Sequence, residues 1–294
     1  PVVWKYFQWL TLLFTEIYLD RYFSDKTGLV KSLNAFFDRY NVQYPEYSPV
    51  DYYAEDDCNK LCLQNATGSG KTLLMHVNAL QYADYAKKHG RENELSRIIL
   101  ITTNEQLSSQ HIAELRESGL QAQPLSGQTA PLSRMEVGLR RVDVMEITKL
   151  AEKDGVNQIA ARSLGDENLL LVDEAHRGMS GSDEGVWFKH RAALCARGFT
   201  FEYSATFEQA VAASKSKKIE NSYAKNILFD YSYRWFYEDG FGKDYSILNL
   251  PESYDKVERL YLTACLLTFY QQMRIYQDKG AFLTEFNLEK PLWV

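Results

Sequence analysis

Two glycines, a lysine and a threonine occupy the end of the stretch LQNATGSGKT, residues 63 to 72. Glycines let the main chain wrap closely around a phosphate, with several backbone N–H groups pointing toward it. We expect Lys71 to reach the β- and γ-phosphates of ATP and Thr72 to bind Mg²⁺. A chance glycine-rich turn is the alternative, and Asn65 departs from the glycine of the strict pattern. The predicted nucleotide-binding segment comprises Ala66, Thr67, Gly68, Ser69, Gly70, Lys71 and Thr72.

An acidic pair follows the apolar run LLLV in the stretch LLLVDEAHRG. Open α/β sheets bind ligands at the carboxyl ends of their strands, which is where Asp173 and Glu174 are expected to lie. Asp173 can hold the Mg²⁺ that bridges the phosphates, and Glu174 can orient or deprotonate the attacking water. His176 is a candidate for coupling ATP to a moving element, although a lone histidine is more often a core residue. An acidic pair after a strand can also cap a helix.

The third candidate is the string Ser204, Ala205 and Thr206, at the end of the predicted strand 199–204. By itself this string occurs by chance. In third place after a phosphate loop and an acidic pair, it predicts a segment that couples nucleotide hydrolysis to movement.

The elements that must position these residues can be read from the apolar runs. Short buried strands are predicted at 61–65, 97–102, 142–147, 169–172 and 199–204. Helical patterns lie between several of them, and the first of these helices ends with Lys87, Lys88, His89 and Gly90. Strands that are apolar on both faces and alternate with helices indicate a mostly parallel sheet covered by helices on both faces.

Weaker candidates lie outside these three sites. Thr103, Asn104 and Ser108 stand near the start of a predicted helix, where they could contact a nucleic-acid phosphate, and plain helix capping explains them equally well. Arg140 and Arg141 could also contact phosphates, although a solvated pair is the simpler interpretation. The aromatic run 229–241 could stack on bases, but packing against the sheet is the more common role.

Composition bounds the class of protein. The 294 residues are 45% hydrophobic and 24% charged, as in a globular protein with a core, and the net charge of -6 provides no overall basic field for nucleic acid. Its four cysteines form no metal-ligand pattern, so we expect free thiols and a cytoplasmic location. Lys5, Gln8 and Glu16 interrupt the apolar N-terminal stretch, which predicts a buried helix and neither a membrane span nor a signal peptide.

The composition of the chain changes after residue 226. An aromatic-rich stretch surrounds the turn at Asp239 and Gly240, which predicts a strand pair or an ordered lid. Residues 253–279 are then expected to form one long helix, closed by Lys279 and Gly280.

Taken together, ATGSGKT, DEAH and SAT resemble motifs I, II and III of the superfamily two helicases and translocases. This resemblance covers residues 61–206. The stretch ITTNEQLSSQHIAEL resembles the motif Ia region of restriction-type helicase subunits. Three further stretches are similar to regions of the helicase subunit of type III restriction enzymes and of related phage-defence helicases: YFQWLTLLFTEIYLDRYF, FDYSYRWFYEDGFGKDYSILNL and NLEKPLWV. The resemblance implies a RecA-like domain with ATP bound on its edge, and it implies that Gln8 could contact the adenine. An ordinary helix-surface glutamine is the alternative for Gln8.

The resemblance also implies a domain plan. It comprises a helical segment at 1–50, a first RecA-like domain at 51–226, a connecting region at 227–285 and the start of a second RecA-like domain at 286–294. The implied activity is ATP-dependent movement on nucleic acid, with duplex DNA preferred, and the implied partners are a methyltransferase, specificity or other defence subunit. Because an arginine finger normally comes from the second domain, we expect this chain alone to bind ATP but to hydrolyse it slowly.

Two other functions stay open on the sequence. The first is a DEAH-type RNA helicase, which keeps the enzyme and changes the nucleic acid. The second is an ATP-gated interaction module without motor activity, which the acidic balance favours slightly.

Overall fold

The computed structural model describes residues 3–47, 49–126, 141–151, 158–176, 184–242, 255–284 and 290–292. The chain divides into two compact units, Pro1–Lys243 and Asp244–Val294, which are described separately. All the candidate site residues belong to the first unit.

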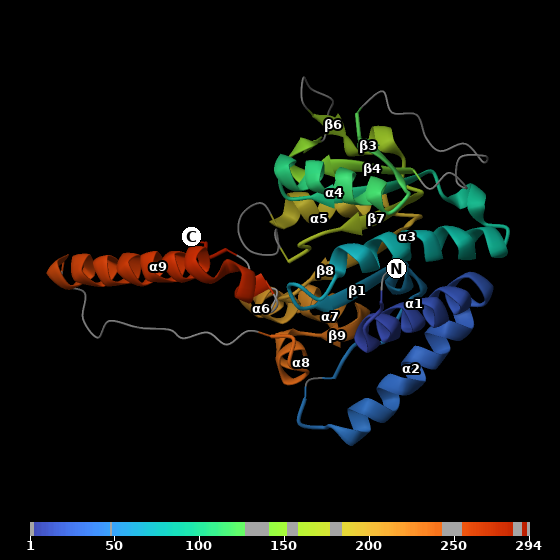
Figure 1. Cartoon of the computed structure of the whole chain (residues 1–294). Coiled ribbons are helices and arrows are strands. Elements are labelled where there is room, and N and C mark those ends of the chain that lie inside the picture. Colours follow the sequence, from blue (N-terminus) through green and yellow to red (C-terminus); the bar gives the residue numbers. More distant parts are fainter. Residues whose placement is uncertain are drawn as a thin grey trace. The chain divides into compact units, whose positions relative to one another are not determined.

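The first unit is built on a sheet of seven strands (Figure 1). They are β1 (Lys60–Asn65), β2 (Arg97–Thr102), β3 (Gln121–Pro124), β4 (Arg141–Glu146), β7 (Asn168–Val172), β8 (Phe199–Ser204) and β9 (Ile227–Tyr231). Their order is β3-β4-β2-β7-β8-β1-β9, and every neighbouring pair is parallel. The short strands β5 (Leu150–Ala151) and β6 (Ile159–Ala160) pair separately. The predicted α/β fold with a mostly parallel sheet is confirmed.

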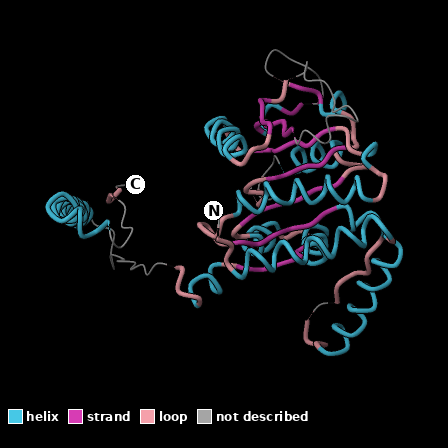
Figure 2. Tube along the Cα trace, turned by 45° about the vertical axis from the view of Figure 1, so that its right-hand side comes forward, coloured by secondary structure: helices cyan, strands magenta, loops and turns pink. Residues whose placement is uncertain are grey.

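Helices cover both faces of this sheet, as Figure 2 shows. One core contains Leu63 of β1 together with side chains of α1 (Tyr6–Ser24), α3 (Lys71–Lys88) and α4 (Glu105–Glu117). The other core contains Cys62 of the same strand with side chains of α5 (Glu184–Leu194), α6 (Phe207–Ser214) and α7 (Lys217–Asn226). Successive residues of a strand point to opposite faces, so the continuous apolar runs reflect burial on both sides.

The N-terminal segment forms two helices, α1 and α2 (Lys26–Gln43). Asp25 separates them, and its side chain accepts a hydrogen bond from the Gly28 N–H at the start of α2. Helix α1 packs beside α3, the helix that follows the glycine-rich loop. The apolar N-terminal stretch therefore forms a helix on the same face of the sheet as α3. Among the described residues, none of the helices has the length and apolar character that a membrane span requires.

The strand pair predicted around Asp239 and Gly240 is wrong. Residues Ile227–Tyr231 form β9, which pairs with β1, and the helix α8 (Tyr233–Glu238) follows it directly. The sheet therefore continues past residue 226, and the aromatic side chain of Tyr231 stacks on Phe7 of α1 with ring centroids 3.9 Å apart. β9 pairs in parallel with β1 from Cys62 to Asn65, with a register shift between Cys62 and Leu63.

The second unit contains the helix α9 (Asp255–Thr284). Its backbone leaves helical geometry at Lys279 and then continues, so the helix is kinked where its end was predicted. Within the stretch 286–294, residues 286–289 and 293–294 lie outside the described part of the chain, so the start of a second RecA-like domain stays a prediction.

Candidate nucleotide site

Three candidate segments meet at one edge of the sheet. The glycine-rich loop follows β1, the acidic pair follows β7, and the Ser-Ala-Thr string begins at the end of β8. These three strands are adjacent in the order β7-β8-β1, and they are parallel. Segments about a hundred residues apart are therefore brought to the carboxyl edge where such sheets bind ligands.

Positive backbone angles shape the glycine-rich loop. The φ angles of Gly68 and Gly70 are 85° and 90°, in the left-handed region that glycine adopts without strain. The Ala66 N–H donates to the carbonyl of Tyr231, which ties the loop to β9, and α3 begins at Lys71. The turn thus delivers the amino end of a helix, which carries partial positive charge, directly after a buried strand.

Gln8 reaches the loop from α1. Its Nε2 donates to the Ser69 carbonyl at 2.8 Å, and its Oε1 accepts from the Lys5 N–H at 2.9 Å. Only 9% of the residue is exposed, so the interpretation of a helix-surface glutamine is wrong. Contact with adenine stays a prediction, because the structure shows the Gln8 amide holding the loop.

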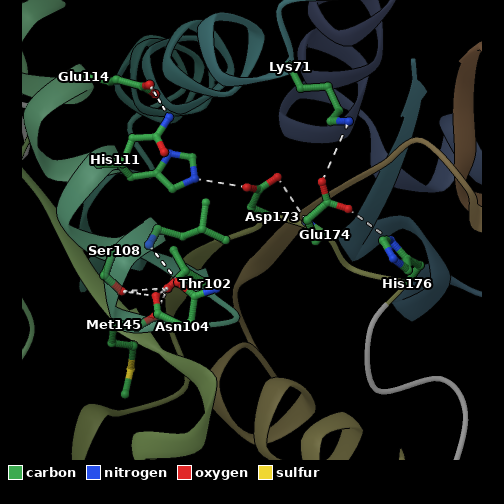
Figure 3. Close-up of polar contacts among 12 residues, drawn as sticks. Lys71, Thr102, Asn104, Ser108, His111, Glu114, Met145, Asp173, Glu174 and His176 are labelled. Atoms are coloured by element: carbon green, nitrogen blue, oxygen red, sulfur yellow. Dashed lines mark hydrogen bonds and ion pairs between the residues drawn. The ribbon is translucent and has the colours of Figure 1, made fainter. Parts of the chain in front are cut away.

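Lys71 points from α3 toward the acidic pair (Figure 3). Its Nζ lies 4.0 Å from Glu174 Oε1 and 3.4 Å from the Asn65 carbonyl, and 11% of its side chain is exposed. Asn65 itself is fully buried, and its side-chain amide has no hydrogen-bond partner among the described residues. A buried lysine at a helix start, beside a carboxylate, matches the donor chemistry that a nucleotide phosphate requires.

The acidic pair is clamped by the two neighbouring strands. The Asp173 N–H donates to Ile101 of β2, and the Ala175 N–H donates to Tyr203 of β8. Glu174 between them has a φ of 50°, a left-handed conformation that costs a non-glycine residue about 1 kcal/mol or more. Residues Asp173–His176 form turns, so the alternative that the pair caps a helix at this point is wrong.

Sequence reasoning missed His111, which contacts the acidic pair from α4. Its Nε2 lies 3.0 Å from Asp173 Oδ2, opposite Lys71 in Figure 3. Burial alone would raise the pKa of Asp173, but the hydrogen bond and charge of His111 and the charge of Lys71 hold that pKa below its usual value. Only a lone histidine in SSQHIAEL could have indicated this contact, and such a signal has no specificity.

The DEAH histidine joins the acidic pair to the Ser-Ala-Thr string. His176 Nδ1 lies 2.8 Å from Ser204 Oγ and 3.3 Å from Glu174 Oε2. Ser204 Oγ also accepts from the Thr206 N–H at 3.0 Å, across Ala205. Ser204 of the string expected to couple hydrolysis to movement therefore contacts the acidic segment through His176, and Thr206 is bonded to Ser204.

The chain's own residues fit a magnesium nucleotide better than a protein-only metal site. The described residues contain no group of three or more His, Cys, Asp or Glu side chains that could hold a metal. Mg²⁺ is commonly bound by one or two protein groups together with phosphate oxygens and water. Thr72 and Asp173 are residues of the type required, with Lys71 available for the phosphates.

Two of the three predicted nucleic-acid contacts, Asn104 and Ser108, have hydrogen-bond partners within the protein. Asn104 caps α4, because its Oδ1 accepts from the Leu107 N–H at 2.9 Å. Ser108 Oγ lies 2.6 Å from Thr102 Oγ1, and Thr103 Oγ1 is buried without a partner in the described part of the chain. The capping alternative is confirmed for Asn104, and the nucleic-acid role of Thr103, Asn104 and Ser108 stays a prediction.

The structure gives different outcomes for the individual basic and aromatic candidates. Arg140 lies outside the described residues, whereas Arg141 is largely buried, with its Nε 3.3 Å from Asp143 Oδ1, so the solvated-pair interpretation is wrong for Arg141. In the aromatic run, Tyr231 is buried while Trp235 and Tyr237 are exposed. Packing is therefore confirmed for Tyr231, and base stacking stays a prediction for the exposed rings.

Comparison with known proteins assigns the family. The model of the type III restriction enzyme, res subunit, matches residues 29–209, which include all three segments of the site. The chain belongs to this family. Membership supports ATP binding by this part of the chain.

Solved structures are also similar, with 41 matching chains. One is the crystal structure of the Hef helicase domain of Pyrococcus furiosus, with 19% identity and a TM-score of 0.32. The match covers 57% of this chain and 33% of that one, so the chain spans about a third of that structure's length. No curated protein matches.

Proposed function

We propose that this chain is the ATP-binding half of a translocase or helicase that acts on duplex DNA in a restriction or phage-defence system. The observation that carries the proposal is the 4.0 Å approach of Lys71 Nζ to Glu174 Oε1 at the meeting point of three parallel strands. The res-subunit family supports the restriction or defence setting and DNA as the partner.

Each site residue then has a chemical task. Backbone N–H groups of the loop that follows Ala66 bind the triphosphate, whereas the Ala66 N–H is engaged with Tyr231, and Lys71 neutralises the terminal charges of the triphosphate. Mg²⁺, when held by Thr72 and Asp173 with the phosphates, supplies further charge neutralisation. His111 fixes the Asp173 carboxylate from the α4 side.

Glu174 would orient or deprotonate the attacking water. This role is supported by its two contacts, because one carboxylate oxygen lies beside Lys71 and the other contacts His176. Loss of negative charge at Glu174 would release that contact, and His176 would pass the change to Ser204 and Thr206. This route is how hydrolysis would reach the segments that bind DNA.

Two substitutions separate binding from chemistry. Lys71→Ala should weaken binding of a fluorescent ATP analogue with Mg²⁺ by about a hundredfold or more, because the terminal phosphates lose their cation. Glu174→Gln should retain binding and slow single-turnover hydrolysis by about 10² to 10⁴, the usual contribution of general base catalysis. Lys88→Ala, in the last turn of the same helix, is the control and should bind normally. Normal binding by the Lys71 variant would contradict the proposal.

The DNA partner requires a separate measurement. Filter binding to duplex DNA, single-stranded DNA and RNA should show affinity that falls steeply with salt, because phosphate contacts release counterions. Absence of nucleic-acid affinity at every salt concentration would favour the ATP-gated interaction module. A preference for RNA would favour the RNA helicase alternative.

A further inference from the structure

A buried carboxylate lies beneath the nucleotide site, on the face of the sheet opposite α3. Glu202 of β8 is only 3% exposed. Its Oε2 lies 3.5 Å from Lys60 Nζ and accepts a hydrogen bond from the Tyr223 hydroxyl, and its Oε1 lies 3.9 Å from Arg191 Nη1. Removing such a charge from water costs several kcal/mol, so its partners must compensate closely.

These partners come from elements that lead to different parts of the site. Lys60 opens β1, whose other end enters the glycine-rich loop. Arg191 lies on α5, and its Nη1 donates at 3.4 Å to the carbonyl of Ala175, the residue that follows Glu174. Tyr223 lies on α7 and is buried. One carboxylate therefore binds side chains from β1, α5 and α7.

Glu202 lies two residues before Ser204, the first residue of the Ser-Ala-Thr string, on the same strand. Residues two apart on a strand point to the same face, so Glu202 and Ser204 share a face of β8. Ser204 contacts His176 at 2.8 Å, as described above. Besides the backbone hydrogen bond from Ala175 to Tyr203, two side-chain links tie the acidic segment to β8. One runs from His176 to Ser204, and the other runs through Arg191 between Ala175 and Glu202.

The surroundings leave this cluster room to rearrange. Lys60, Arg191 and Glu202 line an open cavity of about 370 Å³, together with Cys195 and Thr200. In a close-packed interior, a change of hydrogen bonding at Ala175 would be resisted by neighbouring side chains. Beside a cavity, Arg191 can follow the Ala175 carbonyl when the acidic segment moves.

We propose that Glu202 is a positioning residue that holds the DEAH segment and the Ser-Ala-Thr string in register through Arg191. The inference rests on the proposed ATPase function. Glu202 does not touch the reacting groups, so its loss should slow turnover while nucleotide still binds.

The first test is Glu202→Gln, which keeps the size of the side chain and removes its charge. We expect affinity for Mg-ATP within about twofold of the parent chain and single-turnover hydrolysis slowed about tenfold, a typical effect of a residue that orients another. Asp143→Asn is the matched control, because Asp143 is similarly buried, and its polar partners among the described residues are Arg97, Arg141 and Gln123, outside the three site segments. It should lower the urea midpoint of unfolding without changing turnover.

A second variant separates positioning from stability. A buried ion pair replaced by apolar residues of similar volume is often neutral or stabilising. Glu202→Leu with Arg191→Leu should therefore bring the urea midpoint part of the way back toward that of the parent chain. Recovery is partial because Lys60 loses its carboxylate partner and keeps its contact with the Tyr223 ring. Slow turnover with normal Mg-ATP affinity in this double variant supports the inference.

Three outcomes would overturn it. If turnover recovers together with the midpoint, or if Glu202→Gln turns over ATP as fast as Asp143→Asn, Glu202 has only a structural role and the proposed function stands. If the parent chain itself does not bind Mg-ATP, the proposed function fails and this inference fails with it.

Discussion

Two side chains reach the acidic pair from different helices. Lys71 comes from α3 to Glu174, and His111 comes from α4 to Asp173. Each of the two side chains pairs with one carboxylate, so the two adjacent carboxylates have different partners and can have different functions. Asp173 is held with a lowered pKa, as suits a metal ligand, while Glu174 keeps one oxygen beside Lys71 and the other beside His176.

His111→Ala should therefore raise the Mg²⁺ concentration needed for half-maximal ATP hydrolysis. Residues that orient a metal ligand typically affect metal affinity or activity by 10- to 100-fold, and we expect about tenfold here. His111→Gln, which can still donate to the carboxylate, should recover part of the loss. The exposed neighbour Gln110 provides the control Gln110→Ala. An unchanged Mg²⁺ requirement in His111→Ala would show that Asp173 does not need this support.

At the scale of elements, α1 and the glycine-rich loop form one assembly. Gln8 donates to the Ser69 carbonyl, and a Cβ atom at Gly70 would lie 2.5 Å from Gln8 Nε2. The Gln8 amide can keep its present position against Ser69 because position 70 has no side chain. Gly70 is thus required twice, for its φ of 90° and for this close approach.

Gly70→Ala should weaken nucleotide binding beyond what backbone strain explains. The left-handed conformation costs about 1–2 kcal/mol for alanine, and displacement of the Gln8 amide adds the loss of the loop tether. Gly119→Ala is the matched control, since Gly119 has a φ of 80° with no atom within 4 Å of an added Cβ. Both variants should lose similar stability in urea, but only Gly70→Ala should lose ATP affinity. Equal ATP affinity in the two variants would contradict the role of α1.

At the scale of the whole molecule, a buried histidine links stability to pH. His76 of α3 lies 2.8 Å from Ser118 Oγ, and burial, with a smaller contribution from His111, lowers its pKa from 6.5 to about 4; Glu114 opposes the shift. Between these two values the unfolded chain binds a proton that the folded chain excludes. The free energy of unfolding therefore rises with pH across this window. The contribution of His76 to it is lost as the pH falls toward 4.

From pH 7 to pH 5 the His76 contribution should fall by about 2 kcal/mol. Urea unfolding of the parent chain and of His76→Asn at both pH values measures it. The asparagine variant can keep a hydrogen bond to Ser118 and does not titrate, so its pH dependence should be smaller by about that amount. The same loss in both proteins would assign the effect to other groups.

Much of this protein follows from its sequence, because its signals are local. The glycine-rich turn, the acidic pair and the apolar runs each depend on residues adjacent in the chain, and they predict the parallel sheet and the three segments at its carboxyl edge. Tertiary structure alone decided the contacts of residues far apart in sequence. It placed β9 beside β1, His111 beside Asp173 and the partners of Glu202 around one carboxylate. Those contacts depend on strand order and helix packing, which arise from burial of the whole core and leave no trace in the spacing of neighbouring residues.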